Sequence, residues 1–270
     1  GRGAREANKL THKIAGGGFT GELTYDLIQP ALVHFFGTHT VNAGADTYEM
    51  ADQITDALTV AVDRVVAVHE FEGLVIDQFT LAGDDASGVT YQWATTAKQR
   101  LITGTTNNAA AVAALTDPLG CVLFHETTLR IGPVDDVLVS GDDIEMENFT
   151  LEINRNKVAQ VINSQFRKQS KENGHRDAVL SFQIPRYESD QFLTWEDAGT
   201  PLQAVLIMTD GSAIQEWRMP HMSVESAVIS QSDDSQAPVP VTMRLHENAS
   251  AANVVSGWDF TPEIQLYEGS

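Results

Sequence analysis

Three glycines near the N-terminus have the spacing of a nucleotide-binding loop. Gly16, Gly18 and Gly21 satisfy the pattern Gly-x-Gly-x-x-Gly. A dinucleotide site needs that pattern after a strand and at the start of a helix, so that the pyrophosphate meets the helix N-terminus. Here the glycines lead into alternating apolar and polar residues from Phe19 to Tyr25, which predicts a strand. We therefore interpret them as a bend or bulge and expect no bound cofactor.

Metal-binding chemistry finds little support. The eight histidines are scattered without a His-Glu-x-x-His spacing, and Cys121 is the only cysteine, so neither a zinc motif nor an internal disulfide is predicted. A hard cation such as calcium could be held by four nearby acids, Asp142, Asp143, Glu145 and Glu147. The EF-hand pattern is absent, so a solvated acidic turn is the favoured interpretation and no metal site is expected.

Catalytic signatures are also missing. There is no Gly-x-Ser-x-Gly elbow, and no acid and base pair stands out among the 37 carboxylates. Trp93, Trp195 or Trp217 with a carboxylate pair would suit a carbohydrate-binding or hydrolytic β protein, which stays open as an alternative. We expect no catalytic residues and no enzymatic activity.

The composition is strongly acidic. Lys and Arg number 17 against 37 Asp and Glu, which gives a formal net charge of -20 and a pI of about 4.6. Tight binding of nucleic acid through its phosphates needs a basic surface, so that class is disfavoured. An acidic wall past which nucleic acid moves without sticking is compatible with the charge. No run of about twenty apolar residues exists, so no membrane span is expected.

One segment departs from this acidity. Between 154 and 177 it has only one acid, Glu172, before Asp177. It holds six of the 17 basic residues: Arg155, Lys157, Arg167, Lys168, Lys171 and Arg176. A solvated loop is one interpretation. The sharper one is an inter-subunit loop that docks on an acidic face of an identical subunit, because a long polar loop needs a reason to exist. A basic arm on an acidic body favours head-to-tail assembly into rings or fibres.

Period-two alternation predicts strands through most of the chain, with two short helices. One helix is expected from about Ile28 to Phe35, ended by Gly37, and the other in the insert Ser189 to Ala198. We interpret 38–57 as a polar loop. The strands are expected at 19–25, 58–62, 66–71, 74–81, 89–93, 122–131, 137–139, 149–153, 180–184, 202–208, 217–229 and 239–245.

The pattern occurs twice. Phe19 to Tyr25 corresponds to Leu180 to Ile184, and Glu70-Phe71 corresponds to Glu216-Trp217. Chance alternation between two unrelated β units is the alternative. A duplication predicts a mainly β protein of two tandem β-sandwich or barrel-like domains, each with a flanking short α-helix. The first would span 1–117 with a small-residue linker at 104–117, and the second 118–270 with the long basic loop 154–177.

These segments resemble the major tail tube proteins of long-tailed, siphovirus-like bacteriophages and related viruses. The likeness covers most of the chain. It is carried by Asn148 to Asn154, the long loop to Gly174, the strand Val179 to Ile184, Trp217 to Pro220, Pro240 to Leu245, and, in the first half, Gly16 to Tyr25 and Glu70 to Gly73.

The resemblance implies a virion structural protein that self-assembles into homo-oligomeric rings, stacked as the hollow tail tube through which viral DNA is ejected. It implies a ring of three two-domain subunits or a hexamer. The implied partners are further copies, the tape measure protein and the tail terminator or baseplate proteins, with DNA passing without specific binding. It places the protein in the virion tail after assembly in the host cytoplasm. The first unit's opening strand is expected to be truncated.

The alternate polar residues of two strands are our candidates for the lumen. We expect the side chains of Thr150, Glu152, Asn154, Ser181 and Gln183 to face it. Exposed edges of a β-sandwich are an aggregation liability unless neighbours pair with them, which favours assembly. Another β-sandwich virion component, such as a baseplate, decoration or receptor-binding module, is the nearest alternative.

Overall fold

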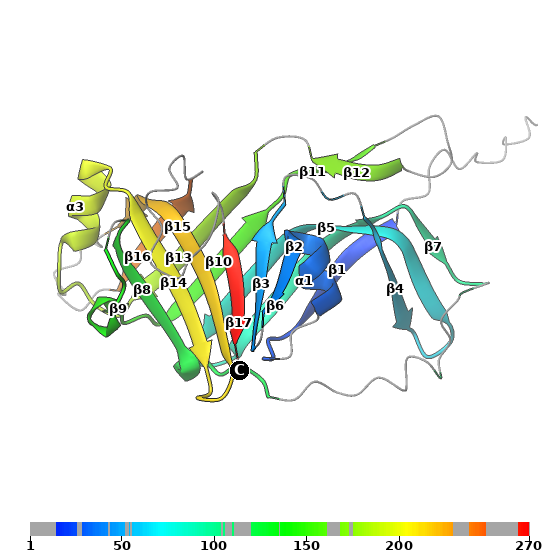
Figure 1. Ribbon diagram of the computed structural model, residues 1–270, viewed down its shortest axis with the longest axis horizontal. Coiled ribbons are helices and arrows are strands. Elements are labelled where there is room, and N and C mark those ends of the chain that lie inside the picture. The colour runs from blue at the N-terminus through cyan, green and yellow to red at the C-terminus, as the bar shows by residue number, and fades with distance from the viewer. Residues whose placement is uncertain are drawn as a thin grey trace, which may run out of the picture.

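The computed structural model describes residues 15–269, apart from 26–28, 43, 52–53, 55, 104, 106–109, 111–119, 135, 161–167, 173–174, 229–237 and 247–263. The fold is mainly β, as predicted, and its strands form one large sheet and one separate hairpin (Figure 1). None of the helices among these residues is long and apolar enough to cross a membrane.

Among the described residues, the first half of the chain contains strands and one α-helix. They are β1 (Ala15–Glu22), α1 (Gln29–Phe36), β2 (Gly37–Asn42), β3 (Ala45–Met50), β4 (Leu58–Asp63), β5 (Val68–Asp84), β6 (Gly88–Ala97) and β7 (Gln99–Leu101). Strands β1, β4, β5 and β6 confirm strands that were predicted in this half, and α1 confirms the helix. Asp26, the expected helix cap, lies outside the described residues.

The described part of the second half contains strands, two short 3-10 helices and a second α-helix. They are η1 (Phe124–Glu126), β8 (Thr127–Pro133), η2 (Ser140–Asp142), β9 (Asp143–Ile144), β10 (Asn148–Asn154), β11 (Lys157–Gln160), β12 (Lys168–Glu172), β13 (Asp177–Ile184), α3 (Gln191–Ala198), β14 (Leu202–Thr209), β15 (Ile214–Ala227), β16 (Val239–Leu245) and β17 (Gln265–Gly269). Gly199 ends α3 in the left-handed conformation, φ 59°, which only glycine adopts without strain.

The large sheet folds into two layers because β15 belongs to both. Layer 1 has the strand order β1-β6-β5-β10-β13-β16-β15, and layer 2 has the order β2-β3-β17-β15-β14-β8-β9. The first part of β15, up to Met222, pairs with β14, and residues from Met222 to Ala227 pair with β16. A register shift between Val224 and Ser226 marks a bulge, which bends a strand and increases its twist.

Aromatic rings join the two layers. Phe79 of β5 stacks on Trp217 of β15 with ring centroids 5.0 Å apart, and Trp93 of β6 lies 4.3 Å from Phe79. Helix α1 adds Phe35 and Phe36 to the same cluster. Large aromatic side chains bury about 150–250 Å² each, so this cluster stabilises the contact by several kcal/mol. It draws on residues of both halves of the chain.

The same series of strand pairings occurs in each half. In unit 1, which we define as β1, α1, β4, β5, β6 and β7, strand β6 pairs with β1 and β5, and β5 also pairs with β4 and β7. In unit 2, defined as β13, α3, β14, β15, β16 and β17, strand β16 pairs with β13 and β15, and β15 also pairs with β14 and β17. All of these pairs are antiparallel.

The two units are joined in both layers. Strand β10 pairs with β5 over seven residues in layer 1, and β17 pairs with β3 in layer 2. Most of the predicted linker 104–117 lies outside the described residues. The division of the chain at 117 into two domains therefore stays a prediction, and the units share one sheet and one apolar core.

Three expectations were wrong in detail. Segment 38–57, read as a polar loop, contains the β2–β3 hairpin, in which Tyr48 is fully buried. Residues 137–139 form no strand and lead into η2. The basic loop contains the separate two-stranded β11–β12 sheet, drawn at the top of Figure 1. Polar hairpins that bury few side chains lack the alternation on which the predictions relied.

Candidate functional site

Layer 1 has one apolar face and one polar face. Phe149, Leu151, Leu180 and Phe182 are at most 2% exposed and point into the core. Because side chains alternate along a strand, their neighbours point away from it. One line of paired residues crosses all seven strands in register: Glu22, Thr90, Ala82, Thr150, Ser181, Thr242 and Ser226. We call the surface that contains this line the polar face.

All five residues predicted to line a lumen lie on strands of the polar face. Glu152 is exposed, and Thr150, Asn154, Ser181 and Gln183 are half-buried between their neighbours. Thr150 pairs with Ser181 and Asn148 with Gln183, and the Asn148 amide donates to Gln183 at 3.3 Å. The structure therefore brings these residues together on one surface. Whether that surface lines a lumen stays a prediction.

Small hydroxyl and amide groups dominate the polar face, with few charges. A second line in register, Thr20, Gln92, Thr80 and Glu152, has one carboxylate. Arg244 of β16 donates to both carboxylate oxygens of Asp177 at 2.7 Å and also contacts Glu225. These two carboxylates raise the pKa of the Arg244 guanidinium. The face is thus less acidic than the composition led us to expect.

Sequence reasoning named only part of this surface. The additional positions on β1, β5, β6 and β16 include Thr20, Thr80, Thr90, Gln92 and Thr242. The alternation that identified β10 and β13 was also present in these strands, so the signal existed. The order of these strands in the sheet could not be predicted from the sequence. Strands β5 and β10, for example, are neighbours although 63 or more residues separate them.

The basic segment divides into a buried base and a projecting hairpin. Arg155 and Arg176 lie at the base, and Lys157, Lys168 and Lys171 belong to β11 and β12. Arg167 lies outside the described residues. The side chains of Lys168 and Lys171 are likewise not described, so only their place on the hairpin is known.

Arg155 is completely buried, which differs from the docking role predicted for it. Its guanidinium donates to the carbonyl oxygens of Phe35 at 2.6 Å, Phe36 at 3.3 Å and Ala51 at 2.8 Å. The first two end helix α1, where carbonyls lack intrahelical partners and the helix dipole favours a cation. Arg155 thereby ties the start of the basic segment to unit 1, and in the folded subunit it offers no donor to a second one.

Arg176 supports the same contact. It donates to the Ala51 carbonyl at 2.6 Å from the other end of the segment. Between them, the backbone N–H of Lys157 donates to the Asp77 carboxylate at 2.6 Å. Both ends of the basic segment are therefore fixed to the first half of the chain, and the hairpin between them forms a separate two-stranded sheet.

Strand β1 leaves one edge of layer 1 open. Among the described strands it pairs only with β6, so its second row of backbone groups meets no described strand. Such an edge is a template for pairing with another chain. Strand β9 likewise pairs only with β8 within the described residues.

The described residues form none of the nucleotide, sugar or metal sites that were considered from the sequence. Gly16 to Gly21 lie within β1 and not before a helix, and they pair with β6 in continuous register, so the bend or bulge predicted for them is wrong. Trp93 and Trp217 are at most 2% exposed and belong to the core, so neither offers a ring face to a sugar. No group of three or more His, Cys, Asp or Glu placed to hold a metal occurs among the residues that the structure describes.

Comparison with known proteins identifies the family. The family described as phage tail tube protein matches residues 2–243, which is nearly the whole chain. No curated protein matches it. The match covers unit 1, the basic hairpin and unit 2 as far as Met243 in β16, and it agrees with the β-rich architecture. This chain belongs to the phage tail tube protein family and is a structural protein of the virion tail.

Proposed function

We propose that the subunits assemble side by side into closed rings, which stack into a hollow tube with the polar face lining the lumen. The observation that carries this proposal is the unbroken polar face across seven strands of layer 1, backed by the apolar core. Viral DNA would pass this face during ejection. The face consists mainly of neutral hydroxyl and amide groups with a few carboxylates, and its Arg244 is already paired with Asp177 and Glu225, so the polyanion stays mobile.

The matching pairings of units 1 and 2 support a duplication. If each unit occupies one position around the tube, three chains supply six positions, whereas single-unit subunits would need six chains. The open edge of β1 favours continuation of layer 1 into the next subunit. Within the tail, the tape measure and the terminator or baseplate proteins are the proposed partners, with assembly in the host cytoplasm.

The basic hairpin is proposed to dock on the adjacent ring. Its ends are fixed by Arg155 and Arg176, and β11 and β12 form a sheet of their own beside the large one. Deleting Gln165 to Asn173 should leave the melting temperature within a few degrees of the wild type but prevent stacking, so electron microscopy should show single rings. Normal tubes from this deletion would refute the docking role.

The lumen assignment can be tested with lysines. Thr150→Lys with Ser181→Lys should give tubes that hold short single-stranded DNA protected from nuclease, because the new cations lie inside. The matched control is Thr47→Lys on layer 2, where bound DNA should stay nuclease-sensitive. Protection by the control, or equal sensitivity of both, would contradict the assignment of the polar face to the lumen.

A further inference from the structure

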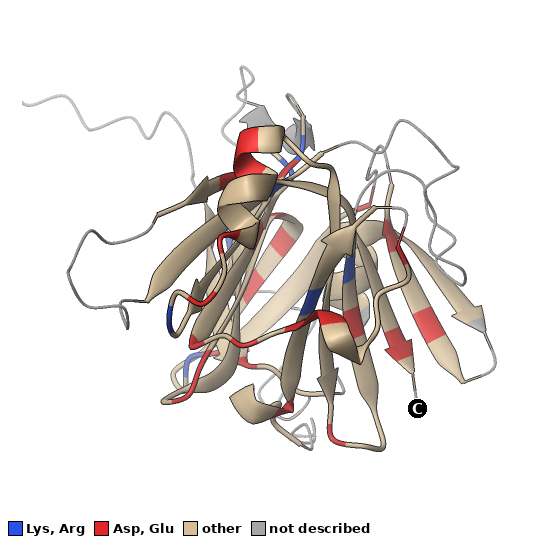
Figure 2. Cartoon of the chain, turned by 90° about the vertical axis from the view of Figure 1, so that its left-hand side faces the viewer, with Lys and Arg blue, Asp and Glu red and all other residues tan. Residues whose placement is uncertain are grey.

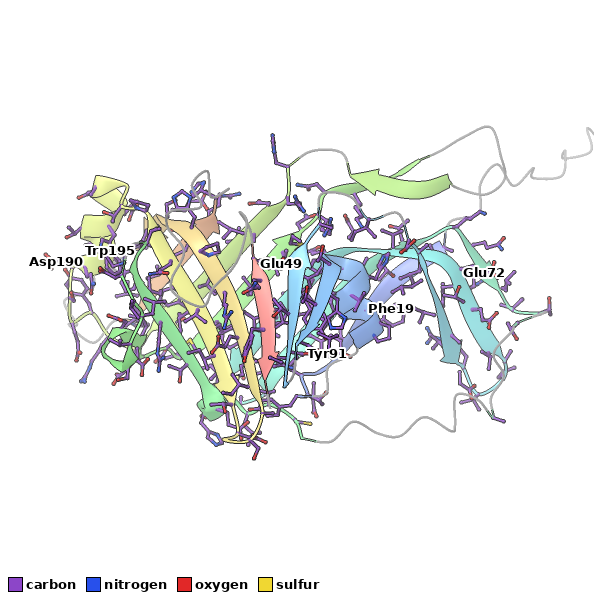
Figure 3. All side chains as sticks on the ribbon, viewed as in Figure 1. Phe19, Glu49, Glu72, Tyr91, Asp190 and Trp195 are labelled. Carbon is purple, nitrogen blue, oxygen red and sulfur yellow. The ribbon has the colours of Figure 1, made fainter. Side chains whose placement is uncertain are left out.

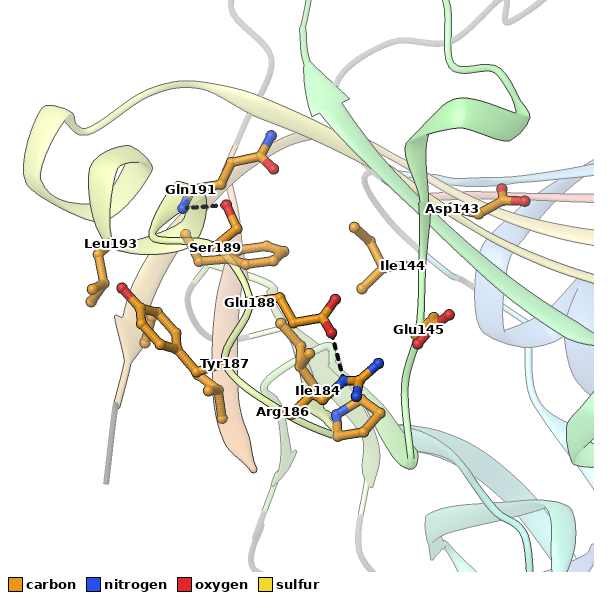
Figure 4. A pocket seen from close by; sticks show the side chains of 14 residues that line it. Asp143, Ile144, Glu145, Ile184, Arg186, Tyr187, Glu188, Ser189, Gln191 and Leu193 are labelled. Atoms are coloured by element: carbon orange, nitrogen blue, oxygen red, sulfur yellow. Dashed lines mark hydrogen bonds and ion pairs between the residues drawn. The ribbon is translucent and has the colours of Figure 1, made fainter. Parts of the chain in front are cut away.

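A pocket at one end of the molecule lies beside the start of helix α3 (Figure 4). Its volume is about 280 Å³, and apolar side chains, Ile144, Ile184, Phe192, Leu193 and Val239, form much of its lining. The connection from β13 to α3 makes one wall, with Tyr187 38% exposed. We call this site the α3 pocket.

The surroundings of the α3 pocket are acidic. Asp143, Glu145 and Glu188 are among its lining residues; Asp143 is paired with Arg130 and Glu188 with Arg186, each at 2.6 Å. Figure 2 faces this end of the molecule and shows Asp and Glu on α3 and on the loops around it, with few Lys or Arg. A partner for this end would carry apolar side chains flanked by positive charge.

The opposite end of the same chain has those properties. The turn between β4 and β5 presents Val65 and Val66, which are 98% and 95% exposed, directly after the exposed Arg64. Lys98 and Arg100 are exposed on the neighbouring part of unit 1, where Glu72 accepts a hydrogen bond from Gln99. Figure 3 shows Glu72 at this end and Asp190 and Trp195 at the other. We call Arg64 to Val66 the tip.

Backbone geometry marks the tip as unusual. Val65 has a φ of 69°, in the left-handed region that β-branched residues avoid, and its N–H donates to the Asp63 carboxylate at 2.8 Å. Two fully exposed valines, one of them strained, contribute nothing to the stability of an isolated subunit. Strained backbone of this kind clusters at contact sites, where the surrounding interaction compensates for it.

The junction between units 1 and 2 supplies a template for contact between copies. The turn after β14 leads to Gln215, whose amide donates to the carbonyls of Thr24 and Tyr25 at 3.2 and 3.3 Å. Those carbonyls belong to the connection from β1 to α1. The start of β15 in unit 2, directly after the β14–β15 turn, therefore contacts the strand-to-helix connection of unit 1.

The corresponding pair of elements, the β4–β5 turn of unit 1 and the β13–α3 connection of unit 2, make no such contact within one chain. In unit 1 the β14–β15 turn corresponds to the β4–β5 turn, which contains the tip. In unit 2 the β1–α1 connection corresponds to the β13–α3 connection, which lines the α3 pocket. These two elements lie at opposite ends of the molecule (Figure 1), so only a second copy can bring them together.

We propose that the tip of one copy inserts into the α3 pocket of the next, repeating between copies the contact that already joins the two units within a chain. The interface is heterologous, with a different surface on each partner, and such contacts close into rings when the rotation permits. This inference rests on the proposed function, because it names the surfaces through which the ring forms.

Opposite location of the two surfaces allows a complementation test. A tip variant, Val65→Asn with Val66→Asp, and a pocket variant, Tyr187→Asp, should each remain monomeric in sedimentation velocity with an unchanged circular dichroism spectrum. Mixed in equal amounts they should form a one-to-one dimer and stop there, because each retains one working surface. Val41→Asp, which replaces a valine on β2 that is 70% exposed, should assemble like the wild type.

The outcomes separate this inference from the proposed function. If wild-type protein forms rings or tubes and the tip variant does so equally, the tip is not the contact while the proposed function stands. If the mixed variants stay monomeric while the wild type assembles, the pairing of tip and pocket is wrong. If the wild type forms neither rings nor tubes with its tail partners, the proposed function itself fails.

Discussion

Helices α1 and α3 occupy corresponding places in units 1 and 2, yet they end differently. The C-terminus of α1 is closed by the buried guanidinium of Arg155, which comes from the other half of the chain. Helix α3 closes itself: Gly199 and Thr200 donate to carbonyls of its own last turn at 3.1 and 3.0 Å. The end of α1 is thus completed by a residue from the second half of the chain, whereas α3 is closed by contacts of its own.

The same asymmetry appears where each first strand meets its helix. In unit 1 the peptide of Val122 fits between β1 and β6: it donates to Leu23 at 2.8 Å and accepts from Val89 at 3.2 Å. In unit 2 the α3 pocket occupies the corresponding place. The site beside the first strand of unit 1 is thus filled by Val122 of the same chain. The corresponding site of unit 2, the α3 pocket, is left open, and a neighbouring subunit would fill it.

Removing the cation that closes α1 should have the largest effect. Arg155→Ala leaves buried carbonyls of Phe35, Phe36 and Ala51 short of donors, and we expect the free energy of unfolding to fall by about 3–5 kcal/mol. Urea denaturation measures this. Arg186→Ala, at the exposed pair with Glu188, should change it by less than about 0.5 kcal/mol. Equal effects would contradict a structural role for Arg155.

His34 in α1 should make the free energy of unfolding fall at acidic pH. Burial lowers the pKa of His34 from its usual 6.5 to about 4, helped by Lys157 and Arg155 and opposed by Asp56. Because the unfolded chain binds this proton more readily, His34 contributes its full stability above pH 6.5 and loses it progressively as the pH falls toward 4.

Replacement of His34 by leucine tests that linkage. Between pH 6.5 and 4.5 the wild type should lose about 2 kcal/mol more stability than His34→Leu, at roughly 1.4 kcal/mol per pKa unit. Denaturant titrations at pH 7.5, 6.5, 5.5 and 4.5 give the two slopes. The same slope for both proteins would show that other groups cause the acid sensitivity.

Two glycines of β1 provide a comparison within one strand. A Cβ on Gly21 would lie 2.9 Å from the Tyr91 hydroxyl and about as close to its ring, whereas a Cβ on Gly17 meets nothing within 4 Å. Gly21→Ala should therefore destabilise by about 1–3 kcal/mol through overpacking. Gly17→Ala should be neutral or slightly stabilising in the same thermal denaturation assay, and a loss as large as that of Gly21→Ala would rule out the packing explanation.

Local pattern predicted much of the fold, and its failures have physical causes. Strands β10, β13 and β16 were predictable because one face of each is buried, which imposes alternation. Strand β17 was missed because it has five residues and its partners, β15 and β3, lie far away in the sequence. Arg155 was taken for a surface residue because charged side chains are rarely buried. Only the fold shows that it meets the end of α1.

The smallest predicted effect concerns the β4–β5 turn, which corresponds to the β14–β15 turn, and here the substitution should stabilise the subunit. The β14–β15 turn has Gly211 at φ 90°, whereas the β4–β5 turn has Val65 at φ 69°. Val65→Gly should relieve the strain and stabilise the subunit by about 1 kcal/mol, less the entropy that glycine adds to the unfolded chain. A melting temperature a few degrees higher, together with weaker ring formation, would show that unit 1 keeps a strained valine for assembly. A lower melting temperature would mean that Val65 stabilises the isolated subunit, and the turn would then need no partner to explain it.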